Sequence, residues 1–154
     1  MQTILTQIAE HRALSRDDAA RAMSLMLQGE ASPEQIAAFL LGLRSRGETL
    51  EELIGLTESM RKFAVPVSAP AHAVDIVGTG GDRSGSFNIS TTTALVCAGA
   101  GAIVAKHGNR SVSSKCGSAD VLELLGVKTE LGKEGVEYCL NEAGIAFLFA
   151  PYFH

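Results

Sequence analysis

The chain of 154 residues is long enough for one domain, or for a small domain with part of another. Hydrophobic residues make up 46% of it, which is enough to bury a core, and the mild net charge of −4 argues against a surface for nucleic acid or anionic membranes. The N-terminus lacks the basic start and apolar core of a signal peptide, and no apolar run approaches the roughly 20 residues of a membrane span.

Residues 1–63 are predicted to form a helical bundle, because apolar residues recur at helical spacing between clear start and stop signals. Gly29 and Gly47 are predicted to end two of the helices. Helix starts that resemble capping boxes occur at Ser15 with Asp18, Ser32 with Gln35, and Thr49 with Glu52. The apolar faces of such short helices can exceed what one small core buries, so the bundle is a candidate for association.

Residues 64–73 contain Pro66 and Pro70 but no charge, and we expect an extended linker or hinge there. Residues 74–154 then alternate strand and helix patterns, which is typical of an α/β unit with a parallel sheet covered on both faces. The predicted strands are Val74–Val77, Ala102–Ala105 and Ile145–Phe149, and the predicted helices are Thr91–Ala100, Ala119–Leu125 and Lys133–Ala143. The last strand is expected to stop at Pro151 without a terminal helix, so we expect a sheet that is incomplete at the C-terminus and a fragment of a longer protein.

A glycine-rich loop follows the first predicted strand, with the sequence Gly78-Thr79-Gly80-Gly81-Asp82. Glycines let the backbone approach an anion and turn its N–H groups toward it. The helix after the loop adds unpaired N–H groups and the positive end of its dipole, together with side-chain donors from Asn88, Ser90 and Thr91. The glycine spacing fits neither the Walker phosphate loop nor the dinucleotide fingerprint.

A second polar loop follows the next predicted strand, where Lys106 brings a positive charge and serines add hydroxyl groups. Because the carboxyl ends of parallel strands meet at one edge of a sheet, we expect the two loops to converge on one ligand. Their side chains are rich in donors and poor in nucleophile–base pairs. The pattern therefore favours a site that grips a phosphorylated substrate over one that attacks it covalently.

The cysteines Cys97, Cys116 and Cys139 are odd in number, widely spaced and without a metal-ligand pattern. They are typical of reduced thiols, and we expect a cytoplasmic protein. Cys116 is expected to pack beside Gly117 rather than to act as a nucleophile, because no His-plus-acid set accompanies it.

The segments GTGGD, NIST and KHGNRSVSSKCGSADVLELLG together resemble the anthranilate phosphoribosyltransferase family, and the similarity runs from the N-terminal helices to the last residue. Ser86 stands where the family usually has threonine, which keeps the hydroxyl group. Members of the family continue well past residue 154, into the part that carries an acidic pair for magnesium and an arginine for anthranilate. The resemblance therefore implies a helical bundle and an α/β phosphoribosyltransferase domain of the nucleoside phosphorylase type, with reduced or no activity in this chain alone.

By this resemblance, the reaction is transfer of the phosphoribosyl group from phosphoribosyl pyrophosphate to the amine of anthranilate, with release of pyrophosphate, in tryptophan biosynthesis. It also implies a homodimer through the N-terminal helices and Mg²⁺ held in part by Ser90. Gly78 and Asn109 are implied in anthranilate binding. The residues implied for phosphoribosyl pyrophosphate are Gly78, Gly81, Asp82, Ser86, Asn88, Ile89, Ser90, Thr91, Lys106, His107, Gly108, Asn109, Arg110, Ser111, Val112, Ser113, Ser114 and Ser118.

Several alternatives remain open at this point. Asp82 can simply cap the turn, Ser90 can be only a helix cap, and Arg110 and Lys115 can form structural ion pairs. His107 is a candidate general base, although an aromatic amine needs little activation. A pyrimidine nucleoside phosphorylase of the same fold and a non-catalytic dimerisation module are the alternative functions.

Overall fold

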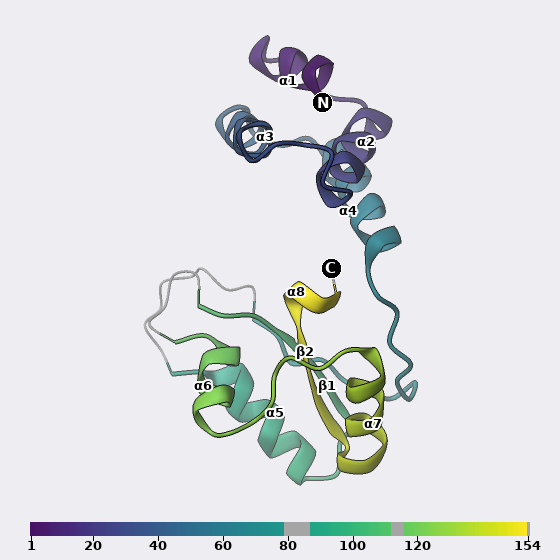
Figure 1. The fold of residues 1–154 in the computed structure, drawn as a ribbon, viewed down its shortest axis with the longest axis vertical. Coiled ribbons are helices and arrows are strands. Elements are labelled where there is room, and N and C mark those ends of the chain that lie inside the picture. Colours follow the sequence, from purple (N-terminus) through teal and green to yellow (C-terminus); the bar gives the residue numbers. More distant parts are fainter. Residues whose placement is uncertain (79–86, 112–115, 154) are drawn as a thin grey trace. The chain divides into compact units, whose positions relative to one another are not determined.

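The computed structural model describes residues 1–78, 87–111 and 116–153, and it divides the chain into two compact units, Met1–Ala64 and Val65–His154. The first unit is helical and the second combines helices with a parallel sheet (Figure 1). The helices of the first unit are α1 (Gln2–Ala9), α2 (Arg16–Leu27), α3 (Pro33–Arg46) and α4 (Leu50–Phe63).

Side-chain caps start three helices of the helical unit where the sequence predicted them. At each start, the side-chain oxygen of a Ser or Thr accepts a hydrogen bond from the backbone N–H of the third helical residue. The pairs are Ser15 with Asp18, Ser32 with Gln35, and Thr49 with Glu52. The last two pairs are complete capping boxes. Each such cap stabilises its helix by about 1 kcal/mol, so these helix starts are specified locally.

The core of the helical unit is a cluster of buried side chains, comprising Ile4, Ile8, Leu14, Ala19, Ala22, Phe39 and Leu43. Helices α2 and α4 approach closely at Gly55, where a Cβ would lie 2.2 Å from the backbone oxygen of Arg16. Glycine is therefore required at this contact. It lowers the helix propensity of α4, but it allows the two helices to pack closely.

A buried carboxylate joins three segments of the helical unit. Glu52 has no exposed surface and accepts hydrogen bonds from the N–H of Leu14 at 2.7 Å, the N–H of Thr49 at 2.8 Å and the guanidinium of Arg46 at 2.5 Å. Burial raises the pKa of Glu52, but the hydrogen bonds from Arg46, Leu14 and Thr49 outweigh it and lower the pKa to about 2. The sequence predicted Glu52 only as part of a helix cap.

The α/β unit is built around two parallel strands, β1 (Val104–Gly108) and β2 (Ile145–Phe149), with Lys106 opposite Phe147 in the register. Its helices are α5 (Ile89–Gly99), α6 (Ser118–Leu124), α7 (Lys133–Ala143) and the single turn α8 (Ala150–Phe153). Phe147 and Phe149 pack against α6, while Ala146 packs against α7, so successive residues of β2 face opposite layers (Figure 1). The predicted boundaries of β2 and α7 are confirmed.

Three expectations for the α/β unit are wrong. Val74–Val77 is not a strand, since only Val74 forms an isolated bridge, to Val104. The strand predicted at 102–105 begins and ends later, so Lys106 lies in the middle of β1 rather than beyond its end. The chain also does not end as a strand, because α8 follows β2 directly.

Val74–Val77 does not form the predicted strand because side chains make the hydrogen bonds that strand pairing with β1 would otherwise supply. The Asp75 carboxylate accepts the backbone N–H of His107 at 3.2 Å, and the Lys106 ammonium donates to the carbonyl of Ile76 at 2.8 Å. These side-chain bonds satisfy backbone groups that a third strand would otherwise pair. The segment thus runs beside β1 without extended pairing.

Residues at the start of the predicted linker are held to the α/β unit. The N–H of Val65 donates to the carbonyl of Phe153 at 3.1 Å, and the N–H of Ser68 donates to Glu137 at 2.7 Å. Val67 packs against the cluster around α7.

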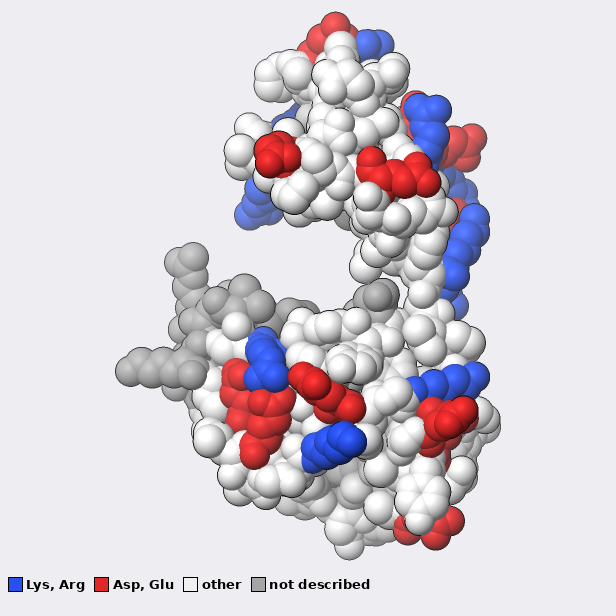
Figure 2. Space-filling view, in the orientation of Figure 1, with Lys and Arg blue, Asp and Glu red and all other residues white. Residues whose placement is uncertain are grey.

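The surface offers no single-sign patch on the face shown in Figure 2, where acidic and basic side chains of the described residues lie beside one another within each unit. None of the helices in the described parts is long and apolar enough to cross a membrane. Cys97, Cys116 and Cys139 are thiols rather than disulfides.

Candidate functional site

Three segments of the α/β unit, one of them β1, meet and form the candidate site. The Lys106 ammonium reaches the carbonyl of Ile76, two residues before Gly78. A Cβ on Gly78 would lie 3.6 Å from the hydroxyl oxygen of Ser90, in the first turn of α5. The entry to the glycine loop, the start of α5 and strand β1 are therefore neighbours, which is the arrangement that the sequence predicted for a phosphate site.

Lys106 is the charged centre of this arrangement. Its side chain lies in β1 with only 4% of its surface exposed, and one of its three N–H donors goes to the carbonyl of Ile76. Burial lowers the pKa of Lys106, while the nearby carboxylate of Asp75 raises it. Among the described residues, the other two ammonium donors have no hydrogen-bond acceptor, so an anion beside β1 would meet an under-satisfied cation.

At the start of α5, the backbone N–H of Ile89 donates to the carbonyl of Phe87 at 2.7 Å. Asn88 is the N-cap residue, yet its side chain makes no capping bond within the described chain and donates instead to the carbonyl of Gly117 at 3.3 Å. The alternative that Ser90 is the helix cap is wrong, because Ser90 lies inside the first turn. Ser90 is half-buried and Thr91 is buried, and both lie in the first turn of the helix.

The bond from Asn88 to Gly117 also ties the start of α5 to the second polar loop. At the beginning of that loop, the carbonyl of Asn109 accepts the hydroxyl of Ser118 at 3.1 Å and the N–H of Ala119 at 3.2 Å. A Cβ at Gly108 would lie 2.4 Å from the Ser118 oxygen, so only glycine allows this approach. The predicted residues Gly108, Asn109 and Ser118 are thus brought together.

Arg110 forms the structural ion pair that the sequence left as an alternative. Its guanidinium donates two hydrogen bonds to Glu123, at 2.7 and 2.8 Å, and lies 5.4 Å from the centre of the Phe149 ring. The hydrogen bond with Glu123 raises the pKa of Arg110 above its usual value. The side chain is 47% exposed and directed toward α6.

The remaining predicted residues divide into two groups. His107 is half-buried and holds Asp75 through its backbone N–H, and Ile89 is half exposed. Ser111 donates its N–H to Asp120 at 3.0 Å, a contact that the sequence did not predict. Outside the described residues lie Gly81, Asp82, Ser86, Val112, Ser113 and Ser114, and the ion-pair candidate Lys115.

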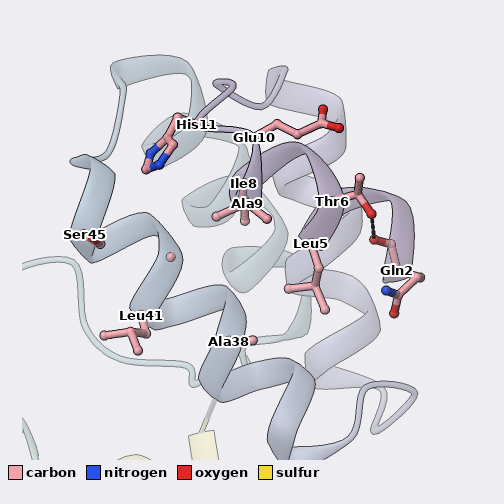
Figure 3. A pocket seen from close by; sticks show the side chains of 11 residues that line it. Gln2, Leu5, Thr6, Ile8, Ala9, Glu10, His11, Ala38, Leu41 and Ser45 are labelled. Carbon is pink, nitrogen blue, oxygen red and sulfur yellow. Dashed lines mark hydrogen bonds between the residues drawn. The ribbon is translucent and has the colours of Figure 1, made fainter.

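No group of three or more His, Cys, Asp or Glu side chains within the described ranges is placed to hold a metal. A groove of about 620 Å³ lies instead in the helical unit, between α1 and α3 (Figure 3). Leu5 and Ile8 line it from α1, and Leu41 and Ser45 line it from α3. Its mostly apolar lining has the character of a contact surface rather than of a phosphate site.

Two models of one family match the chain. The helical bundle domain of the glycosyl transferase family matches residues 2–64, and its a/b domain matches residues 70–154. The chain belongs to this glycosyl transferase family.

Individual relatives agree with the family and with the resemblance seen in the motifs. The anthranilate phosphoribosyltransferase of Salinibacter ruber is 61% identical over 100% of the chain, and the one from Herpetosiphon aurantiacus is 60% identical over 92% of it. These matches cover 45% and 42% of the two relatives, so the chain spans less than half of their length. The predicted resemblance is confirmed.

Solved structures confirm the predicted fold class. The anthranilate phosphoribosyltransferase from Thermus thermophilus matches with a TM-score of 0.84 at 42% identity, over 98% of this chain and 46% of that one. The enzyme from Saccharomyces cerevisiae, in complex with PRPP and Mg, matches with a TM-score of 0.82 at 27% identity, over 99% of this chain and 48% of that one.

Proposed function

We propose that this chain forms the phosphoribosyl pyrophosphate-binding part of an anthranilate phosphoribosyltransferase. The reaction transfers the phosphoribosyl group to the amine of anthranilate and releases pyrophosphate, as a step of tryptophan biosynthesis. The observation that carries the proposal is the meeting of Gly78, the first turn of α5 and the buried Lys106 beside β1. Relatives at up to 61% identity that are anthranilate phosphoribosyltransferases support it.

The chemistry follows from where charge develops. When pyrophosphate leaves the ribose carbon, negative charge builds on the leaving group and positive charge on the sugar. The Lys106 ammonium and the N–H groups at the start of α5 are fixed donors for that negative charge. They stabilise the transition state by position and electrostatics, with no covalent step on the protein.

We also propose Mg²⁺ as the cofactor, with Ser90 as one ligand. The hydroxyl of Ser90 lies beside Gly78, and a yeast relative is known in complex with PRPP and Mg. Ser90 would be one protein ligand among others, since Mg²⁺ also keeps several waters and takes substrate phosphate oxygens. When bound, the ion neutralises charge on the pyrophosphate. For anthranilate itself we propose Gly78 and Asn109, both of which are exposed.

The further proposals concern assembly and location. A homodimer through the N-terminal helices is supported by the groove between α1 and α3 and by the exposure of Leu40 at 55% and Leu41 at 71%. A cytoplasmic location is supported by the three cysteine thiols.

Calorimetric titration tests the function by comparing phosphoribosyl pyrophosphate in the presence of Mg²⁺ with inorganic phosphate. We expect saturable binding of phosphoribosyl pyrophosphate and much weaker binding of phosphate. A preference for phosphate together with a pyrimidine nucleoside would instead identify a nucleoside phosphorylase. Absence of any ligand-induced shift in melting temperature would favour a non-catalytic dimerisation module.

A further inference from the structure

One carboxylate holds together both ends of the second polar loop. The Oδ2 atom of Asp120, in the first turn of α6, accepts the N–H of Ser111 at 3.0 Å and the N–H of Gly117 at 2.7 Å. The two donors are six positions apart in the sequence, and a single oxygen atom joins them. We refer to Ser111 and Gly117 as the loop neck.

The loop neck is packed too tightly for a side chain at its second position. A Cβ on Gly117 would lie 2.3 Å from the backbone nitrogen of Ser111 and 2.5 Å from the backbone carbon of Arg110. Both clashes are with backbone atoms, which cannot move aside by a change of rotamer. Glycine at position 117 thus lets the backbones of Gly117 and Ser111 approach closely enough for one carboxylate oxygen to accept both N–H groups.

The loop neck is also joined to the start of α5. The carbonyl of Gly117 accepts the side-chain N–H of Asn88 at 3.3 Å, and Asn88 is the N-cap residue of α5. Asp120 thus fixes Gly117, Gly117 fixes Asn88, and the first turn of α5 carries Ser90 beside Gly78. A chain of three contacts runs from α6 to the proposed phosphate site.

The carboxylate of Asp120 interacts mainly with the two N–H groups of the loop neck. Hydrogen bonds from Gly117 and Ser111 hold the pKa of Asp120 below its usual range, with a smaller effect from Arg110. The Arg110 guanidinium lies 3.5 Å from Asp120 but makes its two shorter bonds to Glu123. Glu123 therefore shares the partner Arg110 with Asp120 and touches neither donor of the loop neck, which makes it a matched control.

We propose that Asp120 is a positioning residue for the polyphosphate site, an inference that rests on the proposed function. It touches no ligand. By closing the loop neck it holds Ser111 and, through Gly117 and Asn88, the first turn of α5 in the geometry that binds pyrophosphate.

The test compares three variants of the full chain, with Mg²⁺ and pyrophosphate as the probe. Asp120→Ala removes the acceptor, and Asp120→Asn keeps an oxygen that can accept both N–H groups. Glu123→Gln removes the charge opposite Arg110 and keeps an oxygen that can accept the hydroxyl of Thr129, without touching the loop neck. We expect the Kd for pyrophosphate to rise about tenfold or more in Asp120→Ala, and to stay within about threefold of wild type in the other two. Hydrogen exchange at the Ser111 and Gly117 amides should accelerate in Asp120→Ala and remain slow in Asp120→Asn.

Wild-type affinity in Asp120→Ala would overturn the positioning role while leaving the proposed function intact. So would an Asp120→Asn variant that binds as weakly as Asp120→Ala while keeping slow exchange at both amides. If Asp120→Ala does not fold, Asp120→Asn decides, because fast exchange at the loop neck with unchanged affinity would refute the role. A wild-type chain that does not bind pyrophosphate would refute the proposed function as well.

Discussion

The buried carboxylate of Glu52 gives the most quantitative prediction. Since each tenfold change in proton affinity corresponds to about 1.4 kcal/mol, lowering its pKa from 4.5 to about 2 stabilises the folded state by about 3 kcal/mol at neutral pH. Glu52→Gln removes the charge but keeps the shape and one acceptor oxygen. It also leaves the Arg46 guanidinium, which is 11% exposed, without its counter-charge. We therefore expect the free energy of unfolding to fall by about 3 kcal/mol.

Urea denaturation followed by circular dichroism measures this loss. The matched control is Glu58→Gln, because Glu58 pairs with Arg16 on the surface of the same unit, with about half of each side chain exposed. Solvent screens such a pair, so its loss should have a much smaller effect. Equal destabilisation by the two substitutions would refute the assignment of Glu52 as a buried, hydrogen-bonded charge.

The pH dependence of stability provides a second check on Glu52. Its pKa is lower in the folded state than in the unfolded state, so the stabilisation is fully present above about pH 4.5. It is lost as the pH falls from about 4.5 toward about 2. The difference between wild type and Glu52→Gln should shrink over that window. A difference that stays constant through it would contradict the pKa assigned to Glu52.

Three further substitutions test other parts of the structure. Lys106→Met should weaken pyrophosphate binding about tenfold or more in calorimetry, whereas Lys133→Met, at an exposed position of α7, should not, and equal affinities would remove Lys106 from the site. Leu41→Glu places a charge in the groove between α1 and α3 and should convert a dimer into a monomer in sedimentation velocity, while an unchanged dimer would place the interface elsewhere. Gly55→Ala should destabilise the helical unit by about 1–3 kcal/mol, because the added Cβ meets the backbone of α2. Gly99→Ala, where no atom lies within 4 Å, should be neutral or stabilising by up to about 1 kcal/mol, and similar melting temperatures for the two alanine variants would contradict the close packing.

The sequence predicted best what local chemistry determines. The capping pairs at Ser32 and Thr49 and the boundaries of β2 and α7 were correct, because caps and continuous apolar runs act over a few residues. The strand at Val74–Val77 failed for a non-local reason. Asp75 and Lys106 compete for the backbone groups that a ladder would pair, and their proximity depends on the tertiary structure.

The same limit applies to individual site residues. The sequence predicted Lys106 at a strand end near the glycine loop, whereas the residue is buried within β1 and reaches Ile76. That burial depends on neighbouring segments that no local pattern encodes. Glu52 was recognised as a cap, while its bonds to Leu14 and Arg46 join segments that the capping pattern does not include. Asp120 had only the signal of an acidic residue at a helix start, which is common and says nothing of the loop neck.

The central claim is that one polyphosphate binds where Gly78, the first turn of α5 and Lys106 meet. Titration of the isotopically labelled chain with phosphoribosyl pyrophosphate and Mg²⁺, followed by amide NMR shifts, tests it most directly. We predict saturable shifts concentrated at Gly78, at Ser90 and Thr91, and around Lys106, with little change in α1 to α4. Shifts confined to the helical unit, or no saturable shift at all, would contradict the claim.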